Sequence, residues 1–195
     1  MAVATATAPC ELRFDSGRIC LDLLATTHPE ERLDSVERLR DWVTGAGLVP
    51  AGTPLTAVDV RWLTGFRELR LHLGVLVCAE LDGRPAEGAL ARVNAVARQA
   101  PPVPCAVRAD DGVLVRRLRT APGPEELLAL VAREAIELLT DPGARAGLRQ
   151  CAGDNCPLVY LDTSRGRRRR WCSSETCGNR ERVARHRRRA ALART

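Results

Sequence analysis

The sequence predicts a mainly helical α+β protein, with a helical domain over residues 1–148 and a small cysteine-bearing module over residues 149–195. Apolar residues make up 45% of the chain and aromatic residues only 3%, so the core must consist mostly of Leu, Val and Ala, which favours helices. Apolar residues recur at helical spacing through most of residues 18–140. Charge and cysteine content both change near residue 148, where we place the domain boundary.

The helical domain is expected to contain a series of amphipathic helices. The longest has apolar residues at three- and four-residue steps and ends at Asp82-Gly83. Asp34 or Ser35 can cap the second helix, and Pro124 can begin the last. The predicted helices span residues 18–27, 34–46, 56–81, 85–99 and 124–140, and a short helical turn then leads to Cys151.

The apolar period changes after residue 100 and predicts a β-hairpin. Residues 103–108 and 113–119 flank the turn sequence Asp110-Asp111-Gly112. Cys20 and Cys78 fall on apolar helical stretches, and we expect them to be small core residues.

Four cysteines near the C-terminus have the spacing of a metal site. Cys151 and Cys156 form one C-x4-C pair, Cys172 and Cys177 form a second, and fifteen residues separate the pairs. Two short loops that each supply two thiolates match the tetrahedral preference of Zn²⁺. Disulfides and an iron–sulfur cluster are the alternatives, although the ferredoxin spacings do not fit.

The two cysteine pairs predict a small treble-clef-like zinc finger in the order knuckle, hairpin, knuckle, basic helix. Residues 158–162 are expected to form one strand and residues 169–171 the returning strand. Ser173 or Ser174 can cap the final helix, in which Val183 could pack on the finger. Trp171 is expected to serve as core of the finger.

The positive charge belongs to this C-terminal module. Residues 151–195 hold 12 arginines against four acidic residues, a net charge of +8, whereas residues 1–150 carry a net charge of −2. Such asymmetry points to a polyanionic partner, and the alternative is a solvated arginine-rich end. The candidate nucleic-acid-binding residues are Arg167, Arg168, Arg169, Arg170, Arg180, Arg182, Arg185, Arg187, Arg188 and Arg189.

The helical domain carries no motif typical of catalysis, so we do not expect an enzyme. It has no phosphate-binding glycine loop, no H-E-x-x-H and no Cys–His pair at informative spacing. Arg18 and Asp22 are one helical turn apart and are expected to pair locally, with a ligand-binding role as the alternative.

Two stretches resemble a known pair of domains. The C-terminal module is similar to the CGNR zinc finger in Trp171-Cys172-Ser173 and in Cys177-Gly178-Asn179-Arg180. The N-terminal segment resembles the start of the ABATE domain in Phe14–Arg18 and in Leu21-Asp22-Leu23. The resemblance implies that Cys151, Cys156, Cys172 and Cys177 bind one zinc ion. It also implies a stress-related transcriptional regulator.

We therefore expect a zinc-dependent, DNA-binding transcriptional regulator whose N-terminal domain senses a signal or dimerises. The expected partner is double-stranded DNA; a small-molecule ligand of the N-terminal domain and a homodimer stay open. The alternative is a zinc-stabilised module that binds RNA or another protein. Residues 1–9 lack the features of an export signal and no apolar run has the length of a membrane span, so we expect a cytoplasmic location.

Overall fold

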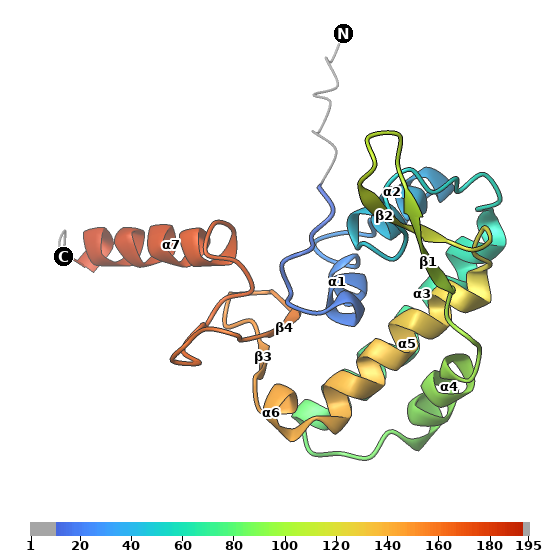
Figure 1. Cartoon of the computed structure of the whole chain (residues 1–195). Coiled ribbons are helices and arrows are strands. Elements are labelled where there is room, and N and C mark those ends of the chain that lie inside the picture. The colour runs from blue at the N-terminus through green and yellow to red at the C-terminus, as the bar shows by residue number, and fades with distance from the viewer. Residues whose placement is uncertain (1–10, 193–195) are drawn as a thin grey trace, which may run out of the picture.

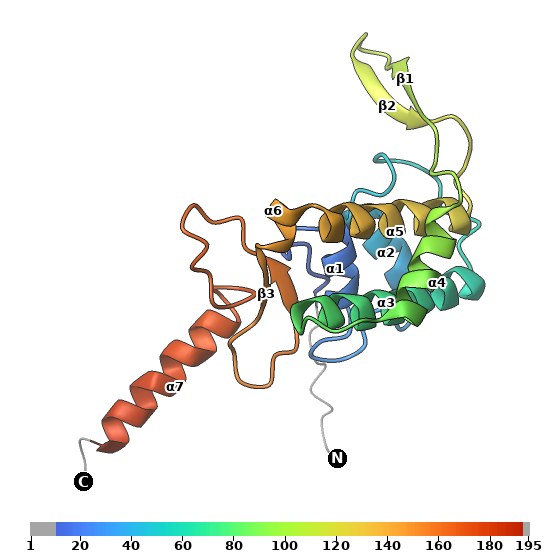
Figure 2. The same ribbon diagram turned by 90° about the horizontal axis from the view of Figure 1, so that it is seen from below.

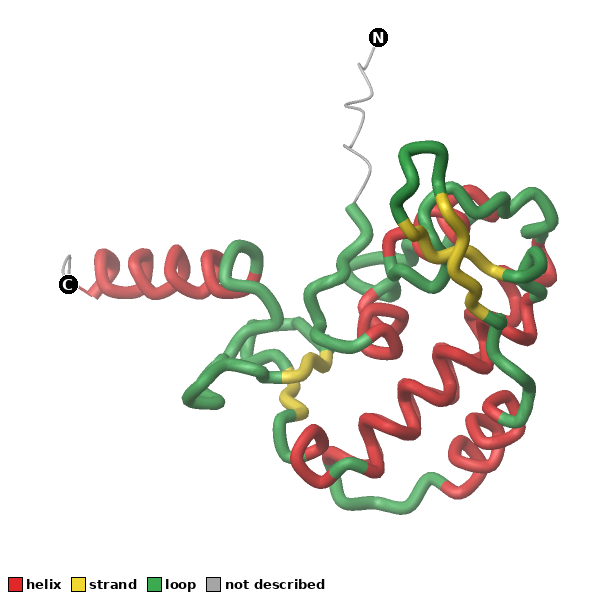
Figure 3. The backbone as a smooth tube through the Cα atoms, viewed as in Figure 1, coloured by secondary structure: helices red, strands yellow, loops and turns green. Residues whose placement is uncertain are grey.

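The computed structural model describes residues 11–192, so Cys10 and the residues 1–9 examined for an export signal lie outside the described part. The mainly helical α+β class is confirmed (Figure 1; Figure 3). In chain order the described elements are α1 (Ile19–Ala25), α2 (Val36–Gly45), α3 (Val60–Leu81), α4 (Glu87–Ala97), β1 (Pro104–Arg108), β2 (Leu114–Leu118), α5 (Pro124–Thr140), α6 (Pro142–Arg145), β3 (Leu148–Gln150), β4 (Val159–Leu161) and α7 (Cys177–Leu192).

Capping side chains decide where the helices begin. Helix α5 has the predicted bounds. The Ser35 hydroxyl accepts a hydrogen bond from the Arg38 amide at 3.2 Å, so α2 begins after Ser35. Helix α3 begins at Val60 rather than residue 56, because the Asp59 carboxylate accepts from the backbone amides of the first turn.

The core lies where α1 packs between α3 and α5. The Trp42 ring of α2 meets Phe66 of α3 edge-on, with ring centroids 5.7 Å apart. Cys20 is a fully buried core residue as predicted, but the prediction for Cys78 is wrong, because Cys78 lies on the exposed side of α3. Within residues 11–192 no helix is both long and apolar enough to span a membrane.

The β1–β2 hairpin extends away from the helical body (Figure 2). Its antiparallel register pairs Pro104 with Leu118 and Arg108 with Leu114, which confirms the hairpin predicted around Asp110-Asp111-Gly112. Helix α7 extends from the opposite end of the molecule (Figures 1 and 2).

The strand pairing of the C-terminal module differs from the sequence prediction. Strand β4 pairs with β3, which precedes the first cysteine pair, in the register Leu148 to Leu161 and Gln150 to Val159. The predicted strand at residues 169–171 does not form, because this segment is held by side chains: the Arg169 amide donates to Asp162 at 2.9 Å, and the Tyr160 hydroxyl donates to the Arg169 carbonyl at 2.6 Å.

The segment before α1 joins the helical body to β4. The Ser16 carbonyl accepts from the Leu161 amide at 2.8 Å, and the Ser16 amide donates to the Asp22 carboxylate at 2.9 Å. Gly17 has φ +89°, and a Cβ atom there would lie 3.2 Å from the Leu161 Cβ. Leu148 and Leu161 share the main apolar core with the helices, so the division at residue 148 stays a prediction.

Gly17→Ala should destabilise the protein more than Gly52→Ala. Both glycines have positive φ, but a Cβ atom added at Gly52 would meet no atom within 4 Å. The Gly52 substitution therefore measures only the loss of unfolding free energy from the strained backbone, about 1 kcal/mol. At Gly17 the new methyl group also presses on Leu161, and we expect a total of about 2–4 kcal/mol. Chemical denaturation of both variants checks this, and equal losses would show that the Gly17–Leu161 approach is not tight.

Asp22→Asn should stabilise the protein at pH 7.5. Burial is the largest cause that raises the pKa of Asp22 to about 6, from an ordinary 3.8. A raised carboxyl pKa favours folding below about pH 4, and this contribution is lost as the pH rises to 6. The gain in unfolding free energy for the neutral amide is at most about 3 kcal/mol. Urea unfolding at pH 7.5 and 4.5 measures it, and a less stable variant at pH 7.5 would contradict the prediction.

Candidate metal centre and basic helix

The first cysteine pair lies in the turn between β3 and β4. The Gly153 amide donates to the Cys151 Sγ at 3.4 Å, and the Cys156 amide donates to the Gly153 carbonyl at 3.1 Å. A Cβ atom on Gly153 would lie 3.2 Å from the Cys177 Cβ and 3.4 Å from its Sγ. The turn therefore needs glycine at 153 so that the second cysteine pair can approach.

The second cysteine pair lies at the start of α7. The Cys172 amide donates to the Cys151 Sγ at 3.3 Å, and the Ala152 amide donates to the Arg170 carbonyl at 2.8 Å. The Ser173 hydroxyl accepts from the amides of Glu175 and Thr176 at 3.2 Å, but both residues precede α7, so Ser173 stabilises the turn that leads into the helix and is not shown to cap the helix itself. Cys177 is the first residue of α7, so the cluster sets the direction of this helix.

The four sulfur atoms are close enough together to bind one metal ion. They lie within 4.8 Å of one another, with 3.7 Å between Cys156 and Cys172 and 3.6 Å between Cys172 and Cys177. Sulfur atoms around one Zn²⁺ are about 3.8 Å apart, because the Zn–S bond is about 2.3 Å. All four cysteines are free and buried, so they fit one structural zinc ion rather than disulfides.

The electrostatics of the cluster also favour a cation at its centre. Burial is the largest cause that raises the pKa of Cys156 to about 11, and it raises the pKa of Cys177 further. Burial opposes ionisation of Cys151 too, but the amides of Cys172 and Gly153 outweigh it and lower that pKa. A Zn²⁺ ion held by these four cysteines would supply the charge that keeps all four sulfurs as thiolates and would cross-link the loops.

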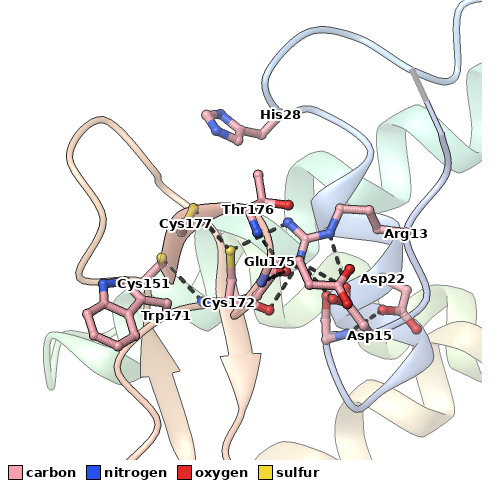
Figure 4. A network of polar contacts seen from close by, with 12 residues as sticks. Arg13, Asp15, Asp22, His28, Cys151, Trp171, Cys172, Glu175, Thr176 and Cys177 are labelled. Carbon is pink, nitrogen blue, oxygen red and sulfur yellow. Dashed lines mark hydrogen bonds and ion pairs between the residues drawn. The ribbon is translucent and has the colours of Figure 1, made fainter. Parts of the chain in front are cut away.

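Arg13 links the N-terminal segment to the cluster, and sequence reasoning missed it. Its guanidinium donates to the Cys172 Sγ at 3.5 Å and to the Cys172 carbonyl at 3.1 Å, while Asp15 pairs with it at 2.9 Å (Figure 4). The stretch 14–18 was singled out in the sequence, but nothing there indicated that the preceding arginine reaches a residue so distant in the chain.

Aromatic side chains complete the interior of the finger. The Arg169 guanidinium lies 4.5 Å from the Tyr160 ring centroid and donates to the Trp171 carbonyl at 2.8 Å. Trp171 packs against the cysteine cluster, as expected of a finger core residue. Arg169 is therefore half-buried against the finger, although it was among the arginines predicted to contact nucleic acid.

The other nine predicted arginines are exposed, but they differ in their partners within the chain. Arg182 donates to the Gly178 and Ser174 carbonyls, and Arg188 pairs with Glu181 at 2.7 Å. Arg167 donates to the Gly143 carbonyl at 3.2 Å. Arg170 lies over the Trp171 ring. The guanidinium groups without a partner among the described residues are those of Arg168, Arg180, Arg185, Arg187 and Arg189.

Two further expectations are wrong. Val183 does not pack on the finger, because 43% of it is exposed on α7. Arg18 does not pair with Asp22. It lies 3.6 Å from Glu134 of α5, whose carboxylate also accepts from the Cys20 amide at the start of α1. Asp22 instead binds the Ser16 amide, so tertiary contacts replace the local pair.

A helical body followed by a tetracysteine cluster and an arginine-rich helix defines a zinc-finger protein with an N-terminal companion domain. Residues 17–142 match the ABATE family, described as "Putative stress-induced transcription regulator", and residues 148–190 match the CGNR zinc finger. The first match covers more than half of the chain, so the chain belongs to the ABATE family. Families of these regulator and zinc-finger types are not usually enzymes. No curated protein matches the chain significantly.

Cys172→Ser should abolish stoichiometric zinc binding, because one of four thiolates is lost and metal binding is coupled to folding of the finger. We expect the helical body to keep its far-UV circular dichroism while the finger becomes sensitive to proteolysis. Elemental analysis measures the zinc, and Cys78→Ser is the matched control, since Cys78 lies outside the cluster. Full zinc content in Cys172→Ser, or loss of zinc in the control, would contradict the assignment.

Proposed function

We propose that this protein is a zinc-dependent DNA-binding transcriptional regulator in which α7 contacts DNA. The observation that carries the proposal is the attachment of an exposed arginine helix to a buried cysteine cluster. Cys177 anchors the first turn, and the Gly178 amide donates to the Ser173 carbonyl at 2.9 Å. The helix that follows is held at one end and open to a partner along its length.

The dimensions and charge of α7 suit a DNA groove. Sixteen residues make a helix of about 24 Å, and the major groove of B-DNA admits an α-helix. Val183, the one large apolar side chain described within α7, is exposed, so no large apolar side chain among the described residues of the helix holds it against the body. The guanidinium groups of α7 other than those of Arg182 and Arg188 therefore remain available for phosphates and base edges.

The arginines of the finger take different roles in this proposal. Arg185, Arg187 and Arg189 lack partners among the described residues, so they supply the main phosphate contacts. Arg167, Arg168 and Arg170 belong to the loop before Cys172 and supply flanking contacts. Arg169 lies over the Tyr160 ring and donates to the Cys172 carbonyl, so its role is to stabilise the finger.

We propose that the helical body senses a signal or dimerises, and that the protein is located in the cytoplasm, where it would meet DNA. Binding of the finger to RNA or to another protein is the alternative. A structured RNA bound more tightly than duplex DNA, or a protein partner that co-purifies while DNA binding fails, would favour it.

Combined substitution of Arg185, Arg187 and Arg189 by alanine should weaken duplex DNA binding and reduce its salt dependence. Each phosphate contact contributes about −0.9 to the slope of log affinity against log salt concentration, so the slope should become shallower by about 2.7. Fluorescence anisotropy of labelled duplex DNA with zinc-loaded protein measures both.

The matched control replaces Arg108, Arg116 and Arg117 of the β1–β2 hairpin, which removes the same charge from another exposed surface. It should keep the wild-type slope. Equal losses in the two variants, or no wild-type affinity for DNA at low salt, would refute the proposed interface.

A further inference from the structure

A groove of about 650 Å³ lies between the helical body and the finger. Its walls come from α1, from one side of α3, and from residues 157–159, which follow the first cysteine pair. Cavities that bind small molecules in proteins are usually about 300–1,000 Å³.

The groove exposes apolar side chains that a folded protein ordinarily covers. Leu71 and Val75 of α3 are 66% and 50% exposed, and Leu24 of α1 faces them across the groove. Gly74 lies between them, and a Cβ atom there would lie 3.6 Å from the Leu24 Cδ2, so any larger side chain would narrow the groove. These residues form a surface suited to an aliphatic chain.

One end of the groove carries a positive charge with unused hydrogen-bond donors. Arg70 is buried, and its terminal nitrogens already have partners within the chain. They donate to both Glu31 oxygens and, at 2.7 Å, to the Thr26 hydroxyl. Arg67 uses only its Nε, which donates to the Leu33 carbonyl at 2.8 Å. Its terminal nitrogens donate no hydrogen bond to the described residues, although its charge also acts on the Glu31 carboxylate, and they can form a fork that fits a carboxylate.

We propose that this groove binds a small amphipathic carboxylate, with the carboxylate at Arg67 and a medium-length aliphatic chain along Leu71 and Val75. The groove follows α3 from Arg67 to Cys78, which is about 16 Å of helix and matches a chain of that size. The role of this acid as the sensed signal rests on the proposed function.

The position of the groove provides a route from its occupant to the finger. Leu158 packs in the cluster that contains the four cysteines, whereas the adjacent Val159 packs in the main core of the helices. An aliphatic chain in the groove touches both residues. It therefore binds the docked arrangement of finger and body more tightly than any arrangement that separates them, and by linkage it changes DNA affinity.

Isothermal titration of full-length, zinc-loaded protein with decanoate and with decanol tests the site in the absence of DNA. Decanoate should bind, and decanol should bind at least about tenfold more weakly, because it lacks the charge that pairs with Arg67. Arg67→Gln should remove this difference, and Val75→Glu should abolish decanoate binding by placing a like charge in the groove.

Arg61→Gln and Val60→Glu are the matched controls, because they make the same changes on α3 outside the groove. Both should bind decanoate as the wild type does, and thermal melts establish that each variant is folded. Equal affinity for decanoate and decanol, unchanged binding in Arg67→Gln, or no binding of either probe would overturn the proposal.

A second copy of the chain in the groove would also overturn it, and sedimentation would show this as a dimer that Leu71→Arg dissociates. The titration contains no DNA, so its failure leaves the DNA-binding proposal intact. Absence of DNA binding by the wild-type protein would likewise leave the ligand site intact.

Discussion

Four sulfur atoms within 4.8 Å of one another determine the structure of the C-terminal quarter of this protein. The β3–β4 turn, the loop before Cys172 and the start of α7 meet at this cluster, and they bury few large apolar side chains besides Leu158 and Tyr160. A core of this size cannot order three loops by the hydrophobic effect alone, so a metal cross-link has to supply the missing stability. The direction of α7 follows, because Cys177 is its first residue.

The finger is also tied to the helical body. Ser16 and Gly17 contact Leu161, Arg13 reaches Cys172, and Leu148 with Val159 completes the core of the helices. The hydrogen bond from the Ser16 amide offsets part of the unfavourable free energy of burying the Asp22 carboxylate. Because the two parts share these contacts, a change in the body can reach the finger through a short path of touching residues.

This shared surface gives the groove beside α3 its significance. One wall of the groove consists of residues 157–159, which continue directly from Cys156 into β4. A ligand there, a metal at the cluster and a polyanion on α7 would all act on one continuous stretch of chain. Such an arrangement suits a regulator, since the energy that couples two sites has to come from contacts that both sites bias.

The amino-acid sequence by itself determined the helix α5 to its last residue, the β1–β2 hairpin, the four cysteines and the charge of the C-terminal module. Periodicity, turn residues and ligand spacing are local properties, so they can be recognised without a fold. Only the tertiary structure decided that β4 pairs with β3, that Arg18 pairs with Glu134, that Arg169 lies over the Tyr160 ring and that Arg13 reaches Cys172. Each of these depends on how the folded segments lie against one another, and neither residue type nor spacing along the chain carries that information.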